Sequence, residues 1–113
     1  AAGRCTVQQA SVAELPFEAE QFDVVTAFET VYFWPELAQN FREVYRVLKP
    51  GGTFFICNEA NGETAKDDKW TQIINGMTIY TDANLKVYLE QAGFCKIQSH
   101  KNKKGWLCVT AQK

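Results

Sequence analysis

Residues 46–52 read Arg-Val-Leu-Lys-Pro-Gly-Gly (RVLKPGG), and this stretch organises the chain on both sides of it. Apolar residues up to it recur at spacings of three and four, which predicts one apolar face of a helix. These residues are Leu37, Phe41, Val44, Tyr45 and Leu48. Pro50 and the two glycines after it end that helix and turn the chain. The apolar run 53–58 that follows predicts a strand.

Strand and helix patterns alternate on both sides of this unit. Residues 22–28 (FDVVTAF) are apolar on both faces, as in a buried parallel strand, and residues 5–9 predict a short strand before it. The residues after Tyr80 predict a helix that is capped by Thr81 or Asp82 and ends at Gly93. Its inward side is predicted to hold Leu85, Tyr88, Leu89 and Ala92. The alternation predicts an α/β fold with a parallel sheet.

The last part of the chain predicts a hairpin of residues 95–100 and 106–112. Its register, centred near Lys103, does not place Cys95 opposite Cys108, so no disulfide is expected between them. Residues 60–80 are less regular. Within them, an apolar stripe from Trp70 to Met77 at helical spacing fits core better than a pocket.

Composition excludes several classes of function. The 113 residues fit one domain, and 46% hydrophobic residues suffice for a core. A net charge of -1 argues against a nucleic-acid or anionic-membrane surface, and no run approaches the roughly 20 apolar residues of a membrane span. The four cysteines form no CxxC pair and have no nearby histidine, so no metal site is expected. Reduced core thiols and a cytoplasmic location are the expectation.

Three strings in order carry a family resemblance. They are Leu15-Pro16-Phe17, then Phe22-Asp23-Val24-Val25, then RVLKPGG. Their order and spacing resemble the class I S-adenosylmethionine-dependent methyltransferases of the small-molecule, ubiquinone/menaquinone-biosynthesis type. The resemblance covers essentially all of residues 1–113 and implies the C-terminal portion of that domain.

The resemblance implies a partial Rossmann-like sheet with strands 3, 4, 5, 7 and 6 of the family order, strand 7 antiparallel. Residues 5–9, 22–28 and 53–58 correspond to strands 3, 4 and 5, and the hairpin to strands 6 and 7. The family's strands 1 and 2, its glycine-rich loop and its acidic ribose clamp have no counterpart, and no GxGxG occurs. The chain therefore reads as a truncated domain.

The resemblance also implies where S-adenosylmethionine would be bound. Ser11 stands where the family often has Asp or Asn against the adenine amino group, and Val12 follows it; an ordinary loop serine is the alternative. Phe28 and Glu29 lie just beyond strand 4, at the sheet edge where ligands gather in open α/β folds. Glu29 could orient an amine or act as a base, or be a solvated loop carboxylate.

Candidates for binding the methyl acceptor are Tyr32, Trp34, Asn58 and Glu59. Tyr32 and Trp34 could line a pocket or pack a cationic methyl group, or only cover the next helix, which is the preferred reading for Phe33. Asn58 and Glu59 follow strand 5. The resemblance implies no universal catalytic residue, and aligning the nucleophile, the methyl group and the leaving sulfur supplies much of the rate.

Two functions remain open at this stage. The first is methyl transfer to a small-molecule acceptor in the parent protein, with weak or absent cofactor binding by this chain alone. The second is a non-catalytic Rossmann-like domain that acts through self-association. An exposed apolar edge on strand 4 would favour a homodimer, in which residues 5–9 either move beside that strand or pair with another chain.

Overall fold

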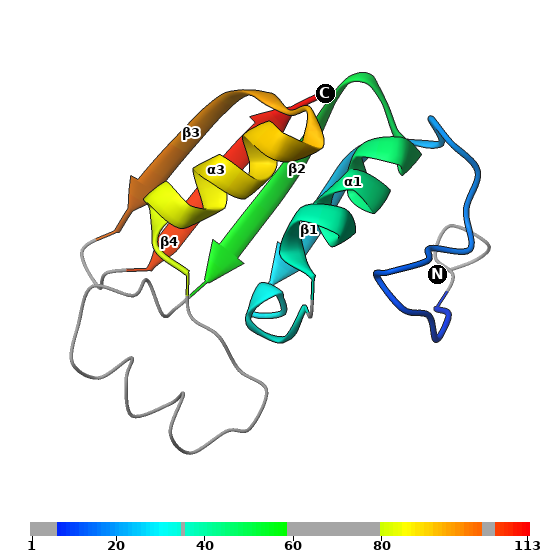
Figure 1. The fold of residues 1–113 in the computed structure, drawn as a ribbon, viewed down its shortest axis with the longest axis horizontal. Coiled ribbons are helices and arrows are strands. Elements are labelled where there is room, and N and C mark those ends of the chain that lie inside the picture. The colour runs from blue at the N-terminus through cyan, green and yellow to red at the C-terminus, as the bar shows by residue number, and fades with distance from the viewer. Residues whose placement is uncertain (1–6, 35, 59–79, 103–105) are drawn as a thin grey trace.

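The computed structural model describes residues 7–34, 36–58, 80–102 and 106–113. Two helices lie on one face of a four-stranded sheet (Figure 1). The elements are β1 (Phe22–Phe28), the 3-10 helix η1 (Val31–Phe33), α1 (Leu37–Val47), β2 (Leu48–Asn58), α3 (Asp82–Ala92), β3 (Cys95–Lys101) and β4 (Leu107–Gln112).

The sheet has the strand order β1-β2-β4-β3. β1 and β2 are parallel, and β4 runs antiparallel to both of its neighbours. The predicted order of the last four strands is thus confirmed, with the hairpin attached to β2. Within the hairpin, Cys95 pairs with Gln112 and Cys108 with His100, so the expected separation of Cys95 from Cys108 is also confirmed.

The strand predicted over residues 5–9 is wrong for the part that the structure describes. Residues 7–9 have no strand pairing, and Val7 is 93% exposed. A strand needs a neighbour to satisfy its backbone N–H and C=O groups, and residues 7–9 have none among the described residues. Residues 5 and 6 lie outside the described residues, as does the apolar stripe predicted from Trp70 to Met77.

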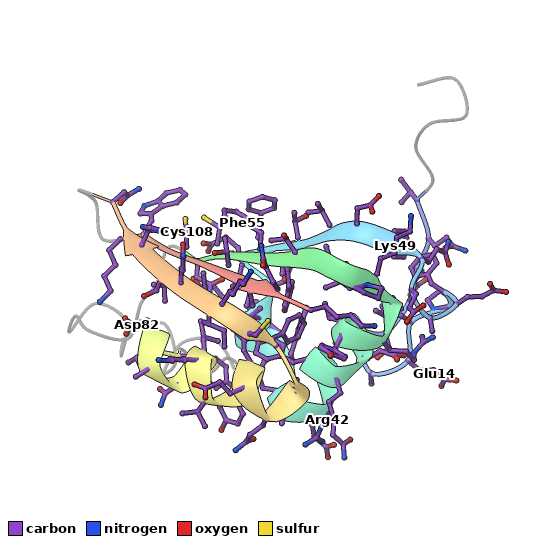
Figure 2. All side chains as sticks on the ribbon, turned by 90° about the horizontal axis from the view of Figure 1, so that it is seen from above. Glu14, Arg42, Lys49, Phe55, Asp82 and Cys108 are labelled. Carbon is purple, nitrogen blue, oxygen red and sulfur yellow. The ribbon has the colours of Figure 1, made fainter. Side chains whose placement is uncertain are left out.

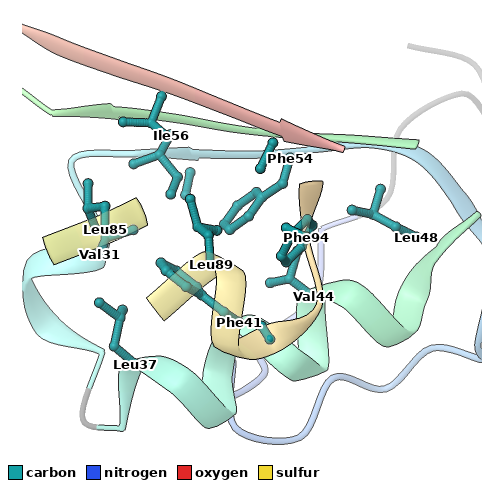
Figure 3. Close-up of a cluster of buried hydrophobic side chains, with 14 of the residues drawn as sticks. Val31, Leu37, Phe41, Val44, Leu48, Phe54, Ile56, Leu85, Leu89 and Phe94 are labelled. Carbon is teal, nitrogen blue, oxygen red and sulfur yellow. The ribbon is translucent and has the colours of Figure 1, made fainter. Parts of the chain in front are cut away.

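The core lies between the helices and one face of the sheet (Figure 3). Phe54 of β2 is at its centre, with ring centroids 5.5 Å from Phe41 and 5.7 Å from Phe94. Leu85 and Leu89 of α3 are also fully buried. The apolar faces predicted for both helices are therefore the faces that pack on the sheet.

Local signals define both ends of α3. Thr81 Oγ1 accepts a hydrogen bond from the Asn84 N–H and Asn84 Oδ1 accepts one from the Thr81 N–H, each at 3.2 Å. Gly93 ends the helix at φ 107°, a left-handed conformation that costs little without a Cβ. A Cβ there would lie 3.2 Å from Cζ of Tyr45 on α1. The predicted capping is confirmed, and the same glycine permits close contact between the helices.

β2 begins at Leu48, directly after α1, and is longer than the predicted strand 53–58. Its pairing with β1 is irregular at the start, where Phe22 pairs with Leu48 but Val24 pairs with Thr53. Pro50, Gly51 and Gly52 lie within this bulge. A Cβ at Gly52 would lie 2.8 Å from the Lys49 carbonyl oxygen, which is too close for a side chain.

The other face of the sheet has no helix over it in the described part of the chain. Figure 2 shows Phe55 and Cys108 pointing away from the helices. Val24 and Phe28 of β1 are each 57% exposed. The expectation that residues 22–28 are buried on both faces is therefore wrong, because α1 and α3 lie on the same face.

Candidate functional site

The carboxyl ends of the parallel strands β1 and β2 meet at one edge of the sheet. Glu29 directly follows β1 at φ 58°, a left-handed conformation that is uncommon outside glycine. Its N–H donates a hydrogen bond of 2.9 Å to the Cys57 carbonyl on β2. Such strained backbones concentrate at binding and catalytic sites. The carboxylate is exposed, and its Oε1 accepts a long hydrogen bond of 3.5 Å from the Tyr32 hydroxyl.

Asn58 ends β2 and is fully buried. Neither Oδ1 nor Nδ2 of its side chain has a hydrogen-bond partner in the described part of the chain. Each unsatisfied buried polar group costs about 1–3 kcal/mol, and such groups are rare in native proteins. The amide is therefore suited to a partner from outside the described residues or to a ligand.

Two thiols lie beside this edge on the open face. The Sγ atoms of Cys57 and Cys108 are 3.2 Å apart, and both side chains are half-buried. Burial raises the pKa of Cys57 to about 11, and the Cys108 thiol and the Glu29 carboxylate act in the same direction. The expectation of core thiols is corrected here, because neither residue is fully buried and Cys95 is exposed.

A cavity of about 570 Å³ lies between residues 8–17, the outer edge of β1, the two ends of η1 and the last turns of α1. Its volume is in the range of small-molecule sites. The described residues that line it are Gln8, Ala10, Val12, Leu15, Phe17, Val25, Thr26, Thr30, Trp34 and Val44.

The four predicted cofactor residues do not share this cavity. Val12 lines it, whereas Ser11, Phe28 and Glu29 do not. Ser11 is exposed, and its Oγ accepts a hydrogen bond of 3.2 Å from the Ala13 N–H, as in a local turn. Phe28 and Glu29 instead lie together at the edge described above.

The predicted acceptor residues are also spread over several environments. Trp34 lines the cavity while its ring stacks on Phe54, with centroids 6.3 Å apart. Tyr32 is buried, and Phe33, expected to cover the helix, is 50% exposed. Asn58 lies at the strand edge, and Glu59 is outside the described residues.

Sequence reasoning missed a set of hydrogen bonds that positions one wall of the cavity. Arg46 on α1 donates from Nη1 to the Phe17 carbonyl at 2.8 Å and from Nη2 to the Leu15 carbonyl at 3.1 Å. Glu43 pairs with the Arg46 guanidinium and accepts the Leu15 N–H at 2.7 Å. The hydrogen bond from Arg46 is the main cause of the lowered pKa of Glu43. The sequence signal that could have indicated this contact was the presence of both Leu15-Pro16-Phe17 and RVLKPGG in one chain.

Among the described helices, none has the length and apolar character needed to cross a bilayer.

Comparison with known proteins agrees with the strand order and the sequence strings. Residues 1–56 match a family model described as a methyltransferase domain. A sterol methyltransferase-like protein of Botryococcus braunii is 36% identical over 73 residues, which are 63% of this chain and 19% of that protein. A ubiquinone/menaquinone biosynthesis C-methyltransferase of Bartonella henselae is 39% identical over 61 residues, which are 54% of this chain and 24% of that protein.

The fold is shared with a SAM-dependent methyltransferase of Thermotoga maritima, with a TM-score of 0.81 and 16% identity. That match covers 96% of this chain and 64% of the Thermotoga chain. The chain thus spans about a fifth to a quarter of the length of the two curated relatives and about two thirds of the Thermotoga chain. The matched family model, the two relatives and the sheet order agree: the chain belongs to the class I S-adenosylmethionine-dependent methyltransferases.

Proposed function

We propose that, in the parent protein, this chain forms the β1–β2 side of an S-adenosylmethionine site that transfers a methyl group to a small molecule. The observation that carries the proposal is that Glu29, in a left-handed conformation, and buried Asn58 both lie at the carboxyl ends of adjacent parallel strands. The Asn58 side chain has no hydrogen-bond partner within the described ranges. Ligands of open α/β sheets gather at this edge. The names of the two relatives favour a sterol- or quinone-like acceptor.

S-adenosylmethionine, when bound, supplies an electrophilic methyl group on a sulfonium. Glu29 fits the cationic methionine end of such a ligand, because its carboxylate is exposed and the Tyr32 hydroxyl restrains it. Phe28, beside it, presents an exposed ring to the same edge. Asn58 can both donate and accept a hydrogen bond, so it suits a hydroxyl or carbonyl of the acceptor. Ser11 and Val12 are proposed for the adenine.

This chain alone is expected to bind the cofactor weakly. It contains no GxGxG sequence, and backbone N–H groups in such a turn normally hold the ligand closely. Losing several hydrogen bonds at about 1 kcal/mol each would turn micromolar affinity into millimolar or weaker. We also propose that residues 1–113 are the C-terminal portion of a methyltransferase domain, and that this is why the chain alone binds the cofactor weakly.

Titration calorimetry with S-adenosylhomocysteine tests the proposal on two proteins. The first is this chain, for which weak binding is expected. The second is a fusion of a family N-terminal half to Ala1, for which micromolar binding is expected. In the fusion, Glu29→Gln should lower the affinity at least about tenfold, since charge-assisted hydrogen bonds contribute roughly 1.5–3 kcal/mol. Glu18→Gln is the matched control, because Glu18 is exposed and remote from this edge.

A fusion that fails to bind, or one in which both variants bind equally, would contradict the assignment. Micromolar binding by the chain alone would contradict the expected weakness, and would mean that another part of the chain or a second copy completes the site.

The second candidate function is self-association through β1. In the described part of the chain β1 pairs only with β2, and Val24 and Phe28 are more than half exposed. Open apolar strand edges favour pairing with another chain. We propose a homodimer, in which Val24→Lys should weaken association while Val87→Lys, on the exposed side of α3, should not. Sedimentation equilibrium measures both, and a monomeric wild-type chain would overturn this candidate.

A further inference from the structure

Four side chains form a row across the open face at the end of the sheet near Glu29. The strand register pairs Phe28 with Cys57, Cys57 with Cys108, and Cys108 with His100. Directly paired residues of neighbouring strands point to the same face, with Cβ atoms about 4.5–5.5 Å apart in antiparallel pairs. The row therefore places two thiols between an aromatic ring and an imidazole, and Figure 2 shows Cys108 pointing to this face.

The backbone already permits a bond between the two thiols. Cys57 and Cys108 are direct partners of antiparallel strands, whose Cα atoms are about 4.5 or 5.5 Å apart. Both spacings lie in the range of about 4.4–6.8 Å that disulfides use. The two Sγ atoms are 3.2 Å apart, and both cysteines are free and half-buried. A small rotation of the side chains would bring the sulfurs into bonding distance.

We propose that Cys57 and Cys108 are a redox modification site that peroxides oxidise to an intrachain disulfide. The Cys108 thiol gives its proton to a base, and the thiolate attacks one peroxide oxygen. The O–O bond breaks to leave a sulfenic acid and hydroxide, which takes up that proton to give one water. The Cys57 sulfur then attacks the Cys108 sulfur, and the sulfenic oxygen leaves as a second water. Two thiols and one hydrogen peroxide thus give one disulfide and two waters.

The order of attack follows from the neighbours of each thiol. Cys108 lies across from His100, whose imidazole can accept a proton. Cys57 lies near the Glu29 carboxylate, which opposes a second negative charge and contributes to its raised pKa. The thiolate is the nucleophile, so Cys108 reacts first and Cys57 resolves the sulfenic acid.

The disulfide would act directly on the strand edge that carries Glu29 and Asn58. The Cys57 carbonyl accepts the Glu29 N–H, and Asn58 is the next residue of β2. A bond from Cys57 to β4 therefore restrains the backbone at Cys57, to which both Glu29 and Asn58 are attached. This inference concerns the thiols of this chain and does not depend on methyl transfer.

The experiment uses the chain with Cys5→Ser and Cys95→Ser, so that only the pair remains. After hydrogen peroxide treatment, we expect both thiols to be lost, the mass to fall by two hydrogens, and one peptide link between positions 57 and 108. On a non-reducing denaturing gel, the protein should run as a single chain, because no disulfide joins two chains. The thermal midpoint should rise by roughly 5–15 °C and return on reduction with dithiothreitol.

Single substitutions in the same background test the order of attack. In the Cys57→Ser variant, a sulfenic acid should accumulate at Cys108 and be trapped by dimedone. In the Cys108→Ser variant, trapping at Cys57 should be several-fold slower, and His100→Gln should slow disulfide formation. Thiols that stay free under peroxide, or a bond only between chains, would overturn the proposal. Equal trapping rates in the two single variants would overturn the assigned order.

Discussion

The two faces of the sheet use alternate residues of the same strands. On the face that α1 and α3 cover, Phe54, Ile56 and Val109 are at most 1% exposed, whereas Val24 and Phe28 on the open face are each 57% exposed. The covered face therefore supplies the hydrophobic stabilisation. The open face carries apolar rings and two thiols next to the proposed ligand edge. Along β2, side chains that point to the helices therefore stabilise the fold, and those that point the other way include a reactive thiol.

The neighbouring phenylalanines of β2 give the strongest test of this difference. Phe54→Ala should lower the free energy of unfolding by about 3–5 kcal/mol, because it leaves a cavity between both helices and the sheet. Phe55→Ala should cost about 1 kcal/mol or less, since its ring lies on the open face. Urea denaturation measures both variants. Equal losses would mean that the open face is covered in solution.

Alanine substitutions at two glycines distinguish the cost of a positive φ from the cost of contact between the helices. Both have positive φ, 107° at Gly93 and 82° at Gly51. Gly51→Ala should cost about 1 kcal/mol, since no described residue beyond its two chain neighbours lies within 4 Å of the added Cβ. Gly93→Ala should cost about 2–3 kcal/mol, because the methyl group also meets the Tyr45 ring of α1. Thermal unfolding compares them, and a larger loss at Gly51 would show that contact between the helices matters less than argued.

The cap of α3 tests how firmly the covering layer is anchored. Thr81→Ala removes the side-chain oxygen that accepts the Asn84 N–H, and should cost about 1 kcal/mol. Thr26→Ala on the exposed part of β1 is the matched control and should change stability by less than about 0.5 kcal/mol. Chemical denaturation distinguishes them. Similar values would indicate that α3 is held by packing without its cap.

The smallest expected effect is the pH dependence of the contact between α1 and residues 15–17. The pKa of Glu43 is lowered below its ordinary value of 4.5, chiefly by the Arg46 hydrogen bond. A lowered folded-state pKa gives stability that is present above the unfolded value and is lost as pH falls through the folded value. Glu43→Gln should therefore flatten the acid side of the stability curve, and Glu18→Gln should leave it unchanged. Unfolding across an acid pH series measures this, and two parallel curves would contradict it.

Prediction from sequence succeeded where the signal was local. The bounds 22–28 were predicted and observed, and α3 is capped by Thr81, one of the two predicted caps, and by Gly93. Apolar periodicity and these two residues act within a few residues. The open face could not be predicted, since FDVVTAF reads the same whether or not a second layer covers it. The hydrogen bonds from Arg46 to residues 15 and 17 and the Cys57–Cys108 contact join residues 29 to 51 positions apart, and only the folded register brings them together.

The bulge at the start of β2 also decides which side chains of β1 point to the helices and which to the open face. From Phe22 to Val24 the chain advances two residues, while β2 advances five, from Leu48 to Thr53. The excess is odd, so the alternation of β1 is inverted: Phe22 and Val25 both pack toward the helices, and Val24 and Phe28 face outward. Shortening the bulge by one residue while the strand pairing is kept would restore even phase. Since paired residues point to the same face, Phe28 and Cys57 would then turn together toward the helices, while Ala27, Phe54 and Ile56 would turn out of the core. Glu29 would leave β1 on the opposite side of the sheet.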